Sequence, residues 1–158
     1  MHTRIQASVI GATGYAGAAL CSLLERHGGV ELTGRYASGR VDAASVTAPA
    51  GARLDVERLD IEAMLASRPG CVFLATPNEV SADLAPRLIA SGIRVIDLSG
   101  AFRLKQAEAY PRWYGFDHPA PALLEESVYG LTEWCDGSLD SARLVANPGC
   151  YATSALMA

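Results

Sequence analysis

The sequence lacks long hydrophobic runs, and none reaches the roughly 18 apolar residues that a membrane-spanning helix needs. It also lacks an excess of basic residues: 13 Lys and Arg stand against 17 Asp and Glu, and the formal net charge is −4. A general nucleic-acid-binding protein would carry a basic face. The first apolar stretch leads directly into glycines, unlike a signal peptide. We therefore expect a cytoplasmic protein without a membrane or nucleic-acid partner.

Paired cysteines are lacking too. Cys21, Cys71, Cys135 and Cys150 are scattered, with no C-x-x-C spacing. This distribution predicts neither a zinc site nor a disulfide framework, and it is typical of a reducing cytoplasm. A single cysteine is most often a small buried apolar residue, and we interpret Cys21 and Cys71 in this way because they lie inside an expected helix and an expected strand. Cys135 has no motif around it and is given no role.

The chain does contain an alternation of strand and helix patterns, and half of its residues are hydrophobic. The expected strands are 6–12, 30–38, 71–77, 93–99 and 142–148; the expected helices are 16–29, 60–70 and 81–92, with Ser81 as N-cap and Pro86 within about the first turn. Residues 39–54 are expected to be a surface excursion, and 102–133 an ordered irregular segment. This alternation predicts an α/β fold with a Rossmann-like, doubly wound, mostly parallel sheet.

The first expected strand runs into GATGYAG, which places Gly11, Gly14 and Gly17 at the strand–helix junction. Glycines there allow a sharp turn, a close approach of the backbone to a pyrophosphate, and close packing of the helix on the sheet. The helix that follows offers its free N–H groups to phosphates. A tight turn without a ligand is the alternative. We favour a dinucleotide site. Its expected contacts are Gly11, Thr13, Gly14, Tyr15, Ala16 and Gly17, with Thr76, Pro77 and Ser99 from later strand ends.

The end of the second expected strand indicates which dinucleotide binds. An NAD enzyme often has an acidic residue there, but this chain reads RYASGR. Ser38 and Arg40 suit a 2′-phosphate, since a hydroxyl and a guanidinium both donate to it. We therefore favour NADP over NAD, with a solvated loop arginine as the alternative interpretation of Arg40.

Cys150 is the candidate nucleophile. It follows Pro148 and Gly149 at the end of an expected strand, and a run of helix-forming residues comes after it. A helix N-terminus lowers the pKa of a cysteine thiol, and the carboxyl ends of strands are where open α/β sheets bind ligands. The sequence therefore predicts that a reactive thiol meets the nicotinamide at this sheet edge.

Four segments together resemble the N-acetyl-γ-glutamyl-phosphate reductases of the semialdehyde dehydrogenase family. They are GATGYAGAAL, DLSGAFRL, WYGFDHPAPALLEESVYGLTE and NPGCYATSAL, in family order and spanning essentially the whole chain. The resemblance implies reduction of an acyl phosphate, a small-molecule substrate in arginine biosynthesis, by NADPH through a thioester on Cys150. It also implies a homo-oligomer, a dimer or tetramer. The chain departs from the family at Asn78, Ala101 and Thr132.

Arg103 and Glu133 are candidate substrate-binding residues. Arg103 follows an expected strand in DLSGAFR, where its guanidinium could clamp the departing phosphate. The alternative is an arginine paired with a nearby acid. Glu133 could orient the substrate or belong only to a turn. A lysine at position 103 should raise the Michaelis constant if the clamp interpretation holds.

The family uses a histidine as acid–base partner, supplied by the substrate domain. His2, His27 and His118 are the histidines of this sequence, and none is assigned that role. We expect residues 1–149 to form the NADP-binding domain and 150–158 to begin a substrate domain that this sequence does not include, so that the chain alone is inactive. The alternatives are a non-catalytic NADP-binding module, the lysine-pathway relative and aspartate semialdehyde dehydrogenase.

Overall fold

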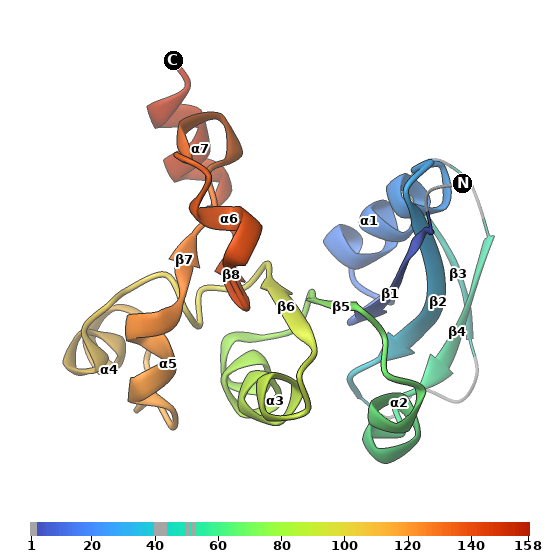
Figure 1. Ribbon diagram of the computed structural model, residues 1–158, viewed down its shortest axis with the longest axis horizontal. Helices are drawn as coiled ribbons and strands as arrows, with labels where there is room; N and C mark the ends of the chain where they lie inside the picture. Colours follow the sequence, from blue (N-terminus) through green and yellow to red (C-terminus); the bar gives the residue numbers. More distant parts are fainter. Residues whose placement is uncertain (1–2, 40–43, 50, 52) are drawn as a thin grey trace. The chain divides into compact units, whose positions relative to one another are not determined.

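The computed structural model describes residues 3–39, 44–49, 51 and 53–158 (Figure 1). The chain divides into two compact units, Met1–Thr76 and Pro77–Ala158. Each is an α/β unit built around parallel strands, and together they follow the Rossmann-like strand–helix alternation that the sequence predicts. Among the described residues, no helix combines the length and the apolar character needed to cross a bilayer.

The first unit is a sheet in the order β3-β4-β2-β1-β5. Its elements are β1 (Ile5–Ile10), α1 (Tyr15–Glu25), β2 (Val30–Ala37), β3 (Ala44–Thr47), β4 (Arg53–Arg58), α2 (Ile61–Ser67) and β5 (Cys71–Leu74). β1 pairs in parallel with β2 and β5, and β2 pairs in parallel with β4. The carboxyl ends of these four strands therefore meet at one edge of the sheet, where α/β proteins place their ligands.

The expected surface excursion over residues 39–54 is wrong for the part of this range that the structure describes; residues 40–43, 50 and 52 lie outside the described residues. β3 and β4 form an antiparallel pair there, with Ala44 opposite Val56. The side chains of Leu54 and Val56 are 1% and 3% exposed, and they join the core formed by α1 and β1. Their alternation with exposed polar residues is the pattern of a strand with one buried face. The Ala-, Pro- and Gly-rich residues before them hid this signal.

The second unit contains parallel strands in the order β6-β8-β7. Its elements are α3 (Asn78–Ala90), β6 (Arg94–Asp97), η1 (Ala107–Ala109), α4 (Tyr110–Trp113), α5 (Pro121–Glu126), β7 (Val128–Tyr129), η2 (Thr132–Trp134), α6 (Ser138–Ser141), β8 (Leu144–Ala146) and α7 (Cys150–Leu156). The segment between β6 and β7 is ordered by packed aromatic rings. Tyr110 is fully buried, with its ring centroid 4.7 Å from that of His118 and 5.3 Å from that of Tyr114.

The start of α3 differs from the prediction. The helix begins at Asn78 with Pro77 as its N-cap, so Ser81 is not the N-cap but a fully buried residue within the helix. Its hydroxyl hydrogen-bonds to the Asp97 carboxylate. Because the helix begins earlier, Pro86 lies in its interior rather than in its first turn. Proline has no N–H for the carbonyl of Ala82, so one helical hydrogen bond is absent there.

Candidate active site

The glycine turn after β1 is fixed by the neighbouring strand. Gly11 has a φ of +92°, a conformation that favours glycine. The N–H groups of Gly11 and Ala12 both donate to the Tyr36 carbonyl oxygen of β2, at 2.7 and 3.0 Å. A Cβ atom at position 11 would lie 2.2 Å from the Ala75 carbonyl oxygen. The turn therefore requires glycine at this position whether or not a ligand binds.

Packing within the protein requires glycine at position 17 but not at position 14. A Cβ at Gly17 would lie 2.2 Å from the Gly11 carbonyl oxygen, so α1 could not pack against the turn with any larger residue. At Gly14 the nearest atom would be 3.5 Å away, an ordinary contact, and the φ of −77° suits any residue. The protein's own packing does not require glycine at position 14. A Cβ there would instead fill the exposed space at the amino end of α1.

This space has the chemistry of a pyrophosphate site. Gly14 is the N-cap of α1, no acidic residue lies in the first turn, and no described side chain caps this helix end. The first N–H groups of a helix have no intrahelical acceptor and attract phosphate oxygens. Tyr15 and Ala16 are exposed here, and Thr13 is half-buried. The residues present thus fit the pyrophosphate of a dinucleotide. Direct contacts from Thr13, Tyr15 and Ala16 stay a prediction.

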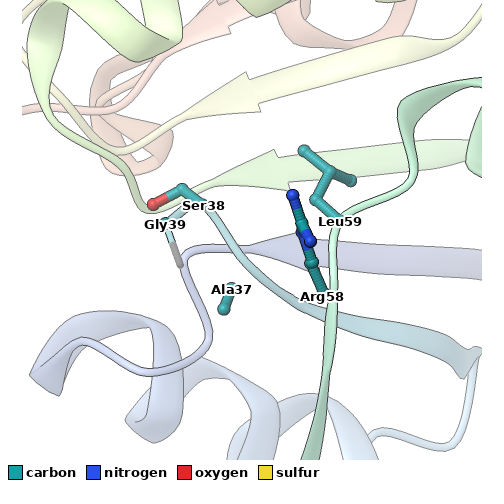
Figure 2. A pocket seen from close by; sticks show the side chains of 5 residues that line it. All are labelled: Ala37, Ser38, Gly39, Arg58 and Leu59. Atoms are coloured by element: carbon teal, nitrogen blue, oxygen red, sulfur yellow. The ribbon is translucent and has the colours of Figure 1, made fainter. Parts of the chain in front are cut away.

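A surface pocket of about 270 Å³ lies at the end of β2, beside the glycine turn. Ala37, Ser38, Gly39, Arg58 and Leu59 line it (Figure 2). Ser38, predicted from the sequence, is exposed there. Arg40, its predicted partner, lies outside the described residues. Arg58 was missed, because its position beside Ser38 depends on the pairing of β4 with β2, which the sequence analysis did not foresee.

The other predicted cofactor contacts fall in both units. Thr76 is buried beside Gly11 at the end of the first unit. Pro77 caps α3, and Ser99 follows β6, both in the second unit. The structure brings Thr76 together with the glycine turn. A shared site that also includes Pro77 and Ser99 stays a prediction.

A buried carboxylate organises the turn after β6. Asp97 is 0% exposed, and its oxygens accept from the Ser99 N–H at 3.1 Å and from the Ser99 hydroxyl at 2.8 Å. The Ser99 oxygen in turn accepts from the Ala101 N–H at 3.0 Å. Burial raises the pKa of the Asp97 carboxyl, and the hydrogen bonds from Ser99 and Ser81 oppose that rise. Ser99 is therefore engaged in holding the backbone of this turn.

Cys150 occupies the position that the sequence predicts. It is the first residue of α7, follows the N-cap Gly149, and is exposed. The backbone before it is tied to the turn after β6. The Asn147 N–H donates to the Asp97 carbonyl oxygen at 2.8 Å, which continues the β6–β8 pairing. Cys21 and Cys71 are buried as expected, and burial raises the pKa of the Cys21 thiol to about 11.

Arg103 links the same two segments through its side chain. Its Nε donates to the Asn147 carbonyl oxygen at 2.9 Å, and its Nη2 donates to the Leu98 carbonyl oxygen at 2.8 Å. Within the part of the chain that the structure describes, Arg103 forms no salt bridge. Burial raises the pKa of the Asp97 carboxyl, and the charge of Arg103 opposes that rise, so the two groups interact electrostatically. The phosphate clamp and the pairing with an acid therefore both stay predictions. The Nη1 atom lies against Gly149, immediately before Cys150.

Glu133 and His118 complete the second unit's titratable residues that the sequence analysis discusses. Glu133 is exposed in η2, and its role stays a prediction. His118 is buried: its Nε2 lies 2.8 Å from the Ala101 carbonyl oxygen, and its Nδ1 accepts from the Ala120 N–H at 3.2 Å. Both ring nitrogens are therefore used structurally. No cluster of three or more His, Cys, Asp or Glu residues suited to a metal ion occurs among the described residues.

Comparison with known proteins identifies the family of this chain. Residues 6–142 match the family described as semialdehyde dehydrogenase, NAD binding domain. The chain belongs to this family. The match covers the glycine turn, the pocket at the end of β2 and the turn held by Asp97. The Rossmann-like α/β fold is thereby confirmed.

Relatives within the semialdehyde dehydrogenase family carry reductase names. The chain is 47% identical over 157 residues to N-acetyl-gamma-glutamyl-phosphate reductase of Dehalococcoides mccartyi, covering 98% of this chain and 45% of the relative. It is 42% identical to the enzyme of that name from Escherichia coli, covering 95% and 47%. The chain thus spans slightly less than half the length of these relatives. A solved probable aspartate-semialdehyde dehydrogenase from Pseudomonas aeruginosa has a TM-score of 0.64 at 27% identity, covering 98% of this chain and 40% of that one.

Proposed function

We propose that the protein containing this chain is an NADPH-dependent N-acetyl-γ-glutamyl-phosphate reductase of arginine biosynthesis, with Cys150 as its nucleophile. The observation that carries the proposal is the exposed thiol at the start of α7, preceded by a backbone that Arg103 and Asp97 hold in place. Relatives that are 42–47% identical over nearly the whole chain carry this enzyme name. The glycine turn and the pocket at the end of β2 fit the two ends of an NADP adenosine diphosphate moiety.

The chemistry at Cys150 has two parts. The thiolate attacks the acyl carbon of N-acetyl-γ-glutamyl phosphate, the carbon–oxygen bond to phosphate breaks, and phosphate leaves with that electron pair. A thioester on Cys150 remains. NADPH, when bound, supplies the hydride that reduces this carbonyl carbon. Hydride addition leaves the thiohemiacetal oxyanion on Cys150. Its oxygen re-forms the carbonyl as the carbon–sulfur bond breaks, which gives N-acetylglutamate semialdehyde and regenerates the thiolate.

The chain's own residues position these steps. Gly11, Gly14 and Gly17 shape the turn for the cofactor pyrophosphate, and Ser38 lies at its adenosine end. Arg103 holds the carbonyl of Asn147 and presents Nη1 beside Gly149, at the approach to the thiol. An anionic acyl phosphate is attracted to a guanidinium at this place.

Mass spectrometry of the complete protein tests the proposal. Incubation with the acyl phosphate but without NADPH should produce one thioester adduct, mapped to Cys150, with release of one phosphate for each thiol modified. C150S should form no adduct, whereas C135S should form it normally because Cys135 lies away from this motif. An adduct at another cysteine, or aspartyl phosphate reacting in place of N-acetyl-γ-glutamyl phosphate, would contradict the proposed assignment.

A further inference from the structure

The pocket at the end of β2 combines residues from two adjacent parallel strands. Ala37 of β2 lies opposite Arg58 of β4, and the Leu59 N–H extends the pairing by donating to the Ala37 carbonyl oxygen at 3.4 Å. This register places Ser38 and Arg58 on the lining of the same pocket (Figure 2). At about 270 Å³ the pocket is slightly smaller than the ~300–1,000 Å³ of sites for whole small molecules, and it suits one portion of a larger ligand.

Among the described residues, none neutralises the charge of Arg58. Its side chain is exposed, and within the described ranges it forms no hydrogen bond or ion pair. Glu57 lies opposite Tyr36, and its charge adds to burial in raising the pKa of the Tyr36 hydroxyl. Because successive strand residues face opposite sides, Glu57 points away from the face of Arg58. Asp60 is the N-cap of α2, and its Oδ1 accepts from the Ala63 N–H at 3.1 Å.

The same strand, β2, contacts the glycine turn and leads into the pocket. Tyr36, whose carbonyl holds Gly11 and Ala12, precedes Ser38 by two residues on the same strand. A dinucleotide whose pyrophosphate lies at the glycine turn therefore extends its adenosine toward this pocket. The pocket offers a hydroxyl, a free guanidinium and the apolar side chain of Leu59 to that group.

We propose that Arg58 is the specificity-determining residue that binds the 2′-phosphate of NADP, with Ser38 donating from the facing strand end. The inference rests on the proposed function and adds a residue to it. A guanidinium forms two parallel hydrogen bonds with a phosphate, which a neutral 2′-hydroxyl cannot match. Arg58 therefore raises affinity for NADPH and leaves affinity for NADH nearly unchanged.

Equilibrium titration of the complete protein with NADPH and NADH tests Arg58, with adenosine 2′,5′-bisphosphate as a probe that lacks the nicotinamide. R58Q should raise the Kd for NADPH and for the bisphosphate by about ten-fold or more, because the charged hydrogen bonds to the 2′-phosphate are lost. The Kd for NADH should change less than about two-fold, because NADH has no 2′-phosphate. R58K keeps the charge without the planar guanidinium and should lie between R58Q and the unmodified protein. Arg4, an arginine lining a different pocket at the amino end of β1, gives the control R4Q, which should change neither affinity.

Three outcomes would be decisive. Equal loss of NADPH and NADH affinity in R58Q would show that Arg58 stacks on adenine instead, and would overturn the inference. An unchanged NADPH preference in R58Q would also overturn it while leaving the proposed function in place. An unmodified protein that binds NADH as tightly as NADPH would contradict the NADPH assignment itself.

Discussion

Arg103 holds the backbone three residues before Cys150, with its Nε donating to the Asn147 carbonyl oxygen at 2.9 Å. The same guanidinium reaches the Leu98 carbonyl oxygen at 2.8 Å, so one side chain joins the segments that follow β6 and β8. A Cβ on Gly149 would lie 2.9 Å from Nη1, and glycine at that position leaves room for the guanidinium. Arg103 is therefore a positioning residue for the nucleophile, whatever Nη1 also binds.

R103K should lower kcat. The lysine ammonium cannot reproduce the two-point contact with Asn147 and Leu98, and a charged hydrogen bond lost here is worth ~1.5–3 kcal/mol, so kcat should fall by about ten-fold or more. Steady-state kinetics with NADPH and the acyl phosphate measure kcat and KM separately.

The matched control for R103K is R112K. Arg112 is an exposed arginine of the same unit whose guanidinium carbon lies 4.8 Å from the ring centroid of Trp113. R112K should leave both constants unchanged. A rise in KM with unchanged kcat in R103K would indicate that Arg103 only binds the substrate phosphate. If neither constant changes, Arg103 has no role in the reaction.

The four thiols should differ in reactivity according to their exposure. Iodoacetamide should modify Cys150 first and the half-buried Cys135 more slowly, whereas Cys21 and Cys71 are buried and should stay unmodified in the folded chain. The thiolate is the reacting form, and burial raises the pKa of the Cys21 thiol to about 11. Peptide mapping over time measures the order, and denatured chain gives the reference in which all four react. Equal protection of Cys150 and Cys21 would contradict the exposed nucleophile.

The local elements were predictable where the sequence pattern and the tertiary environment agree. The continuous apolar run at residues 71–77 predicts a buried strand, and β5 lies within it. The glycines of residues 11–17 predict a strand–helix turn, and packing at Gly11 and Gly17 shows why larger residues do not fit. Pro148 and Gly149, followed by helix-forming residues, predicted a helix that starts at Cys150, and α7 starts there.

The errors occurred where a distant partner decides the structure. Ser81 has the residue type of an N-cap, but its hydroxyl hydrogen-bonds to the carboxylate of Asp97, sixteen residues later in the chain. β4 is a strand because β2 pairs with it, and only that pairing places Arg58 beside Ser38. The contacts of Arg103 with Leu98 and Asn147 are likewise tertiary. Such long-range pairs leave no mark in local spacing.

The buried His118 should make the chain less stable in mild acid. Burial lowers the pKa of its imidazole from the ordinary value of 6.5. The unfolded chain therefore binds the proton more readily than the folded chain. The contribution of neutral His118 to the free energy of unfolding is fully present above pH 6.5 and is lost as the pH falls through the lowered pKa. Protonation also removes Nδ1 as the acceptor for the Ala120 N–H.

Urea unfolding of the chain between about pH 7.5 and pH 5 measures this effect. H118Q should unfold at lower urea at the higher pH, by about 1 kcal/mol or more for a buried hydrogen bond, and should lose part of the pH dependence. The exposed His27 gives the control H27Q, which should retain the full dependence. Identical pH profiles for H118Q and the unmodified chain would contradict the assignment.

Substitutions at Gly14 and Gly17 should have separate effects on cofactor binding and on the stability of the fold. G17A places a Cβ 2.2 Å from the Gly11 carbonyl oxygen and should destabilise the chain by about 1–3 kcal/mol, as overpacking does. G14A meets nothing closer than 3.5 Å, so its melting temperature should stay the same or rise slightly. If a pyrophosphate lies against the backbone at Gly14, G14A should nevertheless raise the Kd for NADPH by about ten-fold, which is ~1.4 kcal/mol. Thermal unfolding and NADPH titration of both variants measure the two effects, and a stable G14A variant that binds NADPH normally would place the pyrophosphate elsewhere.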